Sequence, residues 1–201
     1  MFRFRVKMNP AVVMSMQHDW HSWNNIISAG WEYGFFHAKE RNNDRSLLFR
    51  VENGSILVQA THMPTRDFDT PEIKGNILVE NYNPKPVGVI DFDVVMAVYS
   101  RLENNKLRFH NDYASRVGFF EKRLRSLGYA DKILRVEPGK SFNFRFVKNL
   151  IGKPVDFELP ACNFTVKLDV EDSANFLSLI ARGISREKSS GCGLIVLREV
   201  E

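Results

Sequence analysis

One order of elements, strand–helix–strand–strand, can be predicted twice along this chain of 201 residues, and it restricts the folds open to the chain. Residues 2–8 alternate apolar and basic side chains, which is typical of a half-buried strand. Asn9-Pro10 then suits the start of a helix, with Asn as the cap. We expect this helix from about Ala11 to Ser28, because its apolar side chains fall within one narrow arc.

A hairpin follows the first helix. Residues 46–52 and 56–60 are apolar, strand-like runs joined across Asn53-Gly54, a strong signal for a tight turn. His62-Met63-Pro64 ends the second run, and an acidic, proline-bearing stretch comes next. Its short segment 73–79 can supply a fourth strand.

The second half repeats this order without visible sequence identity to the first. A strand is predicted over 89–99 and a helix over 111–127, where Tyr113, Val117, Phe120, Leu124 and Leu127 form one stripe and Gly128 is the expected cap. Strands are predicted around 141–147 and 163–168, a helix over 173–182 and a last strand over 194–200.

This element order predicts an α+β chain made of two tandem ferredoxin-like domains of the RRM type, each with βαββαβ topology. The expected boundaries are 1–84 for the N-terminal domain and 85–201 for the C-terminal domain, and Pro84 to Gly88 is the predicted linker.

The loop between the last helix and the last strand is rich in glycine and basic residues. Gly183 stands where a helix cap is expected, and Arg186, Lys188, Gly191 and Gly193 follow. Glycines let a backbone approach a ligand closely and can gather N–H groups into a concavity that suits phosphate. The same pattern is common in plain surface turns. It is not a nucleotide-binding motif, because these glycines precede a strand and do not open a helix.

Charge is distributed unevenly along the chain. Residues 101–150 hold 12 Lys or Arg against 5 acidic residues, whereas residues 51–100 carry a net charge of −4. A basic block within a folded domain is typical of a nucleic-acid-binding surface, although a solvated helix face has the same composition.

Cysteine content and hydropathy bear on where the protein acts. Cys162 and Cys192 form neither a disulfide framework nor a metal-binding pattern, so a reducing, cytoplasmic compartment is expected. The charged start of the chain predicts no signal peptide, and no segment is long and apolar enough to predict a membrane span.

The C-terminal loop also carries a resemblance to a known family. Its sequence G-I-S-x-x-K-S-x-G-C-G-L-I, over residues 183–195, resembles the glycine-rich signature of the CasE family, the CRISPR repeat-processing endoribonucleases of the type I-E Cascade complex. Ser185 replaces the middle glycine of the usual form. The hairpin 48–64 and the segment from Val98 through Phe119 to Leu124 are similar to the family as well, so the resemblance is nearly full length.

The resemblance implies a catalytic histidine on the first helix, a few turns after the opening strand. Both His18 and His21 are candidates, and His21 fits better because Trp20 precedes it as an apolar residue does in the family. Without the resemblance, both would be interpreted as surface histidines on a polar helix face. Lys39 and Arg41 are possible substitutes for a lysine that some relatives carry nearby.

The chemistry implied by the resemblance is metal-independent RNA cleavage. A histidine, whose pKa lies near neutrality, draws the proton from a 2′-hydroxyl or delivers one to the departing 5′-oxygen. The products are a 2′,3′-cyclic phosphate and a 5′-hydroxyl. Arg186, Lys188 and the loop N–H groups would stabilise the charge that develops on the phosphate. No cofactor or metal is expected, since the sequence offers only a lone His-x-x-His and no clustered carboxylates.

RNA recognition would then fall to the basic middle of the chain. The residues expected to contact RNA, about half of which would prove to be plain solubilising charges, are Arg116, Lys122, Arg123, Arg125, Lys140, Arg145, Lys148 and Lys153. The family binds the stem-loop of a CRISPR repeat RNA, cuts at the 3′ base of the stem and joins other subunits of a Cascade-type effector complex.

Two alternatives remain open at the level of the sequence. The first is a catalytically inactive subunit that binds the CRISPR RNA hairpin on the same fold. The second is an unrelated duplicated ferredoxin-like protein that binds a small metabolite, against which the basic block and the terminal loop argue.

Overall fold

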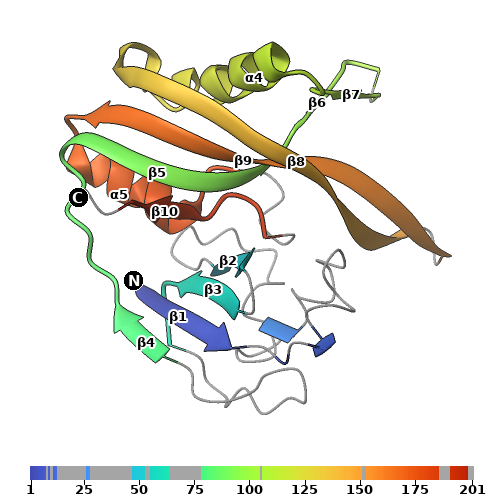
Figure 1. Cartoon of the computed structure of the whole chain (residues 1–201), viewed down its shortest axis with the longest axis horizontal. Coiled ribbons are helices and arrows are strands. Elements are labelled where there is room, and N and C mark those ends of the chain that lie inside the picture. The colour runs from blue at the N-terminus through green and yellow to red at the C-terminus, as the bar shows by residue number, and fades with distance from the viewer. Residues whose placement is uncertain are drawn as a thin grey trace.

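The structure is a computed structural model that describes part of the chain. The described residues are 1–7, 9, 11–12, 26–27, 47–52, 55–63, 78–104, 106–150, 153–185 and 191–198, with backbone only at 78, 145–150, 153, 154, 156 and 157. Two four-stranded antiparallel sheets dominate, and they lie one above the other in Figure 1.

The first sheet contains β1 (Phe2–Lys7), β2 (Leu47–Glu52), β3 (Ser55–Ala60) and β4 (Leu78–Asn81), in the order β2-β3-β1-β4. The second contains β5 (Gly88–Ala97), β8 (Ile133–Leu150), β9 (Lys153–Val170) and β10 (Ile195–Leu197), in the order β10-β5-β9-β8. Each order places the first strand of the set between the third and the fourth, which is the arrangement of the ferredoxin-like plan. The predicted fold class is therefore confirmed.

The second sheet is covered by α4 (Tyr113–Arg125) and α5 (Ser173–Arg182), and η1 (Ala130–Lys132) follows α4. Side chains on alternate positions of β5 and β9 pack with Phe120 and Leu124 of α4 and with Phe176 and Ile180 of α5, all four fully buried. The spacing of four residues places each pair on one helix face, so each helix buries one apolar stripe against the sheet.

Helix ends follow from local chemistry. The Asp112 carboxylate accepts the Ser115 backbone N–H at 2.8 Å and begins α4, and Asp172 does the same for α5 through Asn175. Gly183 ends α5 with a φ of 70°, as predicted.

Several predicted details are wrong. Tyr113 is 61% exposed, one turn ahead of the buried stripe, and the C-cap of α4 is Ser126, two residues before the expected Gly128. The hairpin β8–β9 has 18 residues in each strand and extends to the right in Figure 1, far beyond the predicted runs. A small ribbon of β6 (Tyr99–Arg101) and β7 (Leu107–Phe109) was not predicted.

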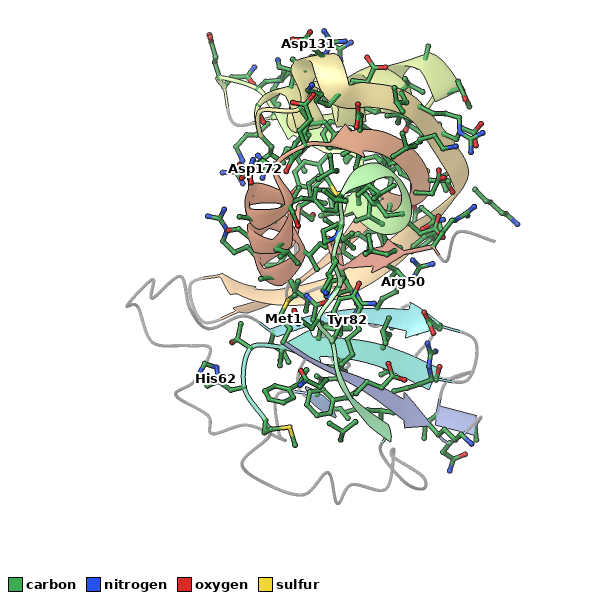
Figure 2. The ribbon with its side chains drawn as sticks, turned by 90° about the vertical axis from the view of Figure 1, so that its left-hand side faces the viewer. Met1, Arg50, His62, Tyr82, Asp131 and Asp172 are labelled. Atoms are coloured by element: carbon green, nitrogen blue, oxygen red, sulfur yellow. The ribbon has the colours of Figure 1, made fainter. Side chains whose placement is uncertain are left out.

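The two sheets are joined by a buried polar network. Gln59 of β3 donates to the Ile180 carbonyl at 2.8 Å and accepts two N–H groups from Arg3 of β1 at 3.0 and 3.1 Å. Arg3 also donates to the Ile195 carbonyl at 2.7 Å, and its guanidinium lies 3.4 Å from the centre of the Tyr82 ring. Tyr82 lies beside Met1 between the sheets (Figure 2). The alternation that predicted a solvent-facing Arg3 therefore fails at this residue, because Arg3 is covered by its contacts with β10 and Tyr82, whereas Arg5 and Lys7 on the same face of β1 are exposed.

Candidate nucleic-acid interface

The predicted site residues divide into those that the structure describes and those that it does not. The candidate catalytic residues His18 and His21 lie outside the described residues, as do Arg186 and Lys188. Arg145 and Lys148 lie on β8, at the backbone positions opposite Glu158 and Val155 of β9. The site is therefore built from α4, the ends of the glycine-rich loop and the strands beside them.

Arg116 of α4 is tied to the protein itself. Its guanidinium donates to the backbone carbonyl of His110 at 3.1 Å, to that of Asn111, and to the Ser141 hydroxyl at 3.2 Å. These bonds hold the start of α4 to the segment before it and to β8. This arrangement indicates a structural use of Arg116.

The last turns of α4 carry three basic side chains in three different settings. Arg125 pairs with Glu121 one turn earlier, at 3.3 Å. Arg123 is half-buried, and its Nε donates to the Ile184 carbonyl at 3.1 Å, which fixes the end of the helix to the glycine-rich loop. Lys122 is exposed, and its side chain has no ion-pair or hydrogen-bond partner among the described residues. Cations in a last helical turn are also favoured by the helix dipole.

Lys140 lies on β8 at a local irregularity. The register against β9 shifts between Pro138 and Ser141, and Lys140 is exposed there without a partner in the described part of the chain. Such a bulge twists a strand and redirects its side chains, so Lys140 is free to contact a ligand.

The glycines of the terminal loop are needed for contacts within the protein. Gly193 has a φ of 94°, its N–H donates to the Val95 carbonyl at 2.7 Å, and its carbonyl accepts the Ile184 N–H at 3.1 Å. A Cβ at Gly193 would lie 2.6 Å from the Ser185 nitrogen. Gly191 and Gly193 are both buried. The close approach predicted for a ligand is thus made by the chain itself, and the Gly193 N–H is already bonded.

A cavity of about 330 Å³ lies between α4, the β5–β6 strands and the start of the glycine-rich loop. Its charged lining residues are Arg101, Lys122 and Arg123, and its hydroxyl-bearing residues are Tyr99, Ser100, Ser126 and Ser185. Among its described lining residues there is no Asp or Glu. We refer to it as the α4 cavity. Lys122 and Arg123 were predicted to contact RNA, whereas Arg101 was counted in the basic block and in the segment that resembles the family, without a role of its own.

His110 lies next to this cavity and was not singled out in the sequence. Its Nε2 is 2.9 Å from the Ser100 hydroxyl, and its ring lies 4.9 Å from the Phe119 ring, centre to centre. Burial, and then the positive charge of Arg108, lower the pKa of His110 below its ordinary range. The neutral imidazole is therefore favoured at this position.

The described residues contain no group of three or more His, Cys, Asp or Glu side chains arranged to hold a metal ion. No helix in the same part of the chain is long and apolar enough to cross a membrane.

A family model described as "CRISPR associated protein" matches residues 1–199. The chain belongs to this CRISPR-associated family. No curated protein sequence matches the chain.

Several solved structures have a similar fold. Thermus thermophilus Cse3, bound to an RNA representing a pre-cleavage complex, matches with a TM-score of 0.76 and 19% identity over 98% of each chain. Cas6e from Escherichia coli matches with a TM-score of 0.64 and 16% identity over the full length of both chains. A chain of a CRISPR RNA-guided surveillance complex matches with a TM-score of 0.70 and 18% identity, again over both full lengths. The CRISPR-associated resemblance predicted from the glycine-rich signature is confirmed.

Proposed function

We propose that this protein is a CRISPR endoribonuclease that binds the stem-loop of its repeat RNA and cleaves at the 3′ base of the stem. The observation that carries the proposal is the family match over residues 1–199. Two further facts support it: the similar fold of the CRISPR endoribonuclease Cse3 bound to RNA, and the α4 cavity, whose described lining carries cations and no acidic residue.

Cleavage proceeds by attack of a 2′-hydroxyl on the adjacent phosphate and needs no metal. The 2′-oxygen forms a bond to phosphorus as the bond to the departing 5′-oxygen breaks, which leaves a 2′,3′-cyclic phosphate and a 5′-hydroxyl. His21 is the proposed proton donor or acceptor, with His18 as the alternative, because an imidazole titrates near neutral pH. Arg186 and Lys188 stabilise the charge on the phosphate.

Binding of the stem rests on phosphate contacts from the basic surface, and shape supplies most of the selection. Lys140 is the described residue best suited to such contacts, because it is exposed and its side chain is unpaired among the described residues. Lys122 is also exposed and unpaired in the described part of the chain, but it lines the α4 cavity, so its contact with the RNA lies there and not at the stem. Arg145 and Lys148 on the long hairpin and Arg125 on α4 extend the surface. Arg116 and Arg123 serve it indirectly, by holding α4 and the loop in place.

The enzyme keeps its product and works in a larger assembly. We place the boundary of its two domains at 84/85, within the segment between β4 and β5, with the candidate histidines in 1–84 and the basic surface in 85–201. The protein acts in the cytoplasm as a subunit of a Cascade-type effector complex, in keeping with the similar chain in a CRISPR RNA-guided surveillance complex.

The test is to incubate the purified protein with the repeat RNA of its own host in EDTA, beside His21→Ala and His18→Ala. The proposal predicts one cut at the 3′ base of the stem, lost in the His21 variant while hairpin affinity is retained. Tight hairpin binding without a cut in any sample would leave a non-catalytic binding subunit. Absence of hairpin binding would refute the proposal altogether.

A further inference from the structure

The α4 cavity has the size and lining of a site for one small ligand. Its volume of about 330 Å³ is at the lower end of the range of ligand pockets, which begins near ~300 Å³. An A-form stem is too wide to enter a space of this size. An RNA that reaches into it must therefore do so with an unpaired nucleotide.

The electrostatics of the cavity select an anion. Arg101 and Lys122 are exposed and have no ion-pair partner in the described part of the chain, whereas other basic residues, such as Lys167 with Asp91 at 3.3 Å, are paired. Arg123 adds a third positive charge. Two unpaired cations, Arg101 and Lys122, at a concave site whose described lining contains no carboxylate favour a phosphate group, and a bidentate Arg and a flexible Lys can bind its oxygens together.

The inner wall of the cavity offers a surface for a base. Met96, Ala97 and Phe119 line it, and Tyr99 contributes a second aromatic ring. The Phe119 ring is half-buried and is supported by the His110 ring at 4.9 Å, so its position is fixed before any ligand arrives. Aromatic rings that hold unstacked bases are the usual means by which proteins recognise single-stranded RNA.

Hydroxyl groups supply polar partners between these two regions. The Ser126 hydroxyl donates to the Arg123 carbonyl at 2.7 Å, and the Ser100 hydroxyl lies 2.9 Å from His110 Nε2. Each hydroxyl oxygen still has a lone pair for a further hydrogen bond. They can therefore accept from a 2′-hydroxyl or from the amino group of a base.

We propose that the α4 cavity binds one unpaired nucleotide next to the repeat stem, with its base against Phe119 and its phosphate between Lys122 and Arg101. This inference rests on the proposed function and adds a second determinant of RNA recognition to it, a single-stranded flank that the protein binds separately from the stem. Affinity for the repeat RNA then depends on nucleotides outside the hairpin.

The test compares two RNAs, the bare stem-loop and the same stem-loop with its single-stranded flanks, and four proteins. These are the wild type, Lys122→Met, Phe119→Leu and the control Lys85→Met, which removes one exposed charge that does not line the cavity. Since a stacked base contributes about 1–3 kcal/mol, or about 5- to 150-fold in affinity, the wild type should bind the flanked RNA more tightly by an amount in this range.

Lys122→Met and Phe119→Leu should lose most of that preference and bind the bare stem-loop within about twofold of wild type. Lys85→Met should keep the preference. An abasic nucleotide walked through the flanks should reproduce the loss at one position in the wild type and have no further effect in Phe119→Leu.

Each contrary result has a distinct meaning. Equal wild-type affinity for both RNAs, or an equal loss on both RNAs in the two variants, would overturn the cavity assignment and leave the endoribonuclease proposal intact. Failure of the wild type to bind either RNA would refute the proposed function, and the cavity assignment with it. Thermal unfolding of each variant shows whether a loss comes from the fold, and Phe119→Tyr, which keeps a ring, should restore the preference if Phe119→Leu unfolds.

Discussion

Substitution of Gly193 by alanine should disrupt the loop that borders the α4 cavity. The backbone at Gly193 has a φ of 94°, and an added Cβ would lie 2.6 Å from the nitrogen and 2.8 Å from the Cβ of Ser185. The segment cannot shift easily, because hydrogen bonds join Gly193 to Val95 and to Ile184. Gly128 is a matched control, with a φ of 92° and nothing within 4 Å of an added Cβ.

The two substitutions share the cost of a left-handed backbone and differ in the cost of overpacking. A left-handed backbone costs alanine about 1–2 kcal/mol, partly offset by about 0.4–1 kcal/mol from the less flexible unfolded chain. Gly128→Ala should therefore lower the free energy of unfolding by about 1 kcal/mol. Gly193→Ala adds an overpacking cost of about 1–3 kcal/mol, since its neighbour is backbone, and should lose about 3 kcal/mol in total.

Thermal unfolding and RNA binding measure the difference. For a chain of this size about 1 kcal/mol shifts the unfolding midpoint by about 2–4 °C, so Gly193→Ala should melt about 6–12 °C below wild type and Gly128→Ala about 2–4 °C below. Because Ile184 and Ser185 line the α4 cavity, Gly193→Ala should also weaken binding of the flanked repeat RNA, whereas Gly128→Ala should not. Equal midpoints for the two variants would refute the steric argument.

Three further predictions follow from described contacts. Gln59→Leu should lower the free energy of unfolding by about 3 kcal/mol in urea titrations, because it removes an acceptor from the buried Arg3. The double variant with Arg3→Met should recover part of that loss, and additive losses would contradict a coupling between Gln59 and Arg3. Arg116→Met should cost about 1–2 kcal/mol of stability but leave the salt dependence of binding to the flanked repeat RNA unchanged, whereas Lys122→Met should reduce the salt slope for that RNA by about one. A reversed pattern would contradict the structural use of Arg116. The lowered pKa of His110 means that the unfolded chain binds more protons than the folded protein once the pH drops below about 6.5. The free energy of unfolding should therefore fall as the pH drops from above 6.5 through the folded-state pKa. His110→Asn should lose this part of the decline, and an unchanged pH profile in the variant would contradict the argument.

The sequence predicted the elements of the fold where local signals and packing agree. Helix 173–182 has a capping acid, an apolar face and a closing glycine, and its observed bounds are the predicted ones. The Asn53-Gly54 turn signal predicted the hairpin, and the alternation of apolar and basic side chains predicted the first strand. The strands β2, β3 and β1 lie close to their expected ranges.

Prediction failed where long-range packing overrides a local pattern. The strands β8 and β9 contain Pro138, Gly139, Pro154 and Pro160, which local rules interpret as breaks. In the fold they occur within a long hairpin, and the register shifts near Pro138. The burial of Arg3 likewise depends on β10, whose Ile195 lies 192 residues further along the chain.

Only part of the candidate site was predicted, because long-range packing decides which of the basic side chains reach it. A basic block identified α4 and thereby Lys122 and Arg123, but no sequence rule separates a lysine that lines a cavity from an arginine that holds a helix in place, as Arg116 does. Arg101, Ser100 and Phe119 join the site only because β5, β6 and α4 meet, and their spacing along the chain carries no motif.

The measurement that tests the central claim most directly uses a repeat RNA with a single 2′-deoxy nucleotide immediately 5′ of the cut. If the 2′-hydroxyl is the nucleophile, this RNA should bind as tightly as the all-ribose RNA and resist cleavage in EDTA, while the all-ribose RNA should yield a 2′,3′-cyclic phosphate and a 5′-hydroxyl. Cleavage of the deoxy-substituted RNA at the same position would contradict the account, as would a product that ends in a 3′-hydroxyl.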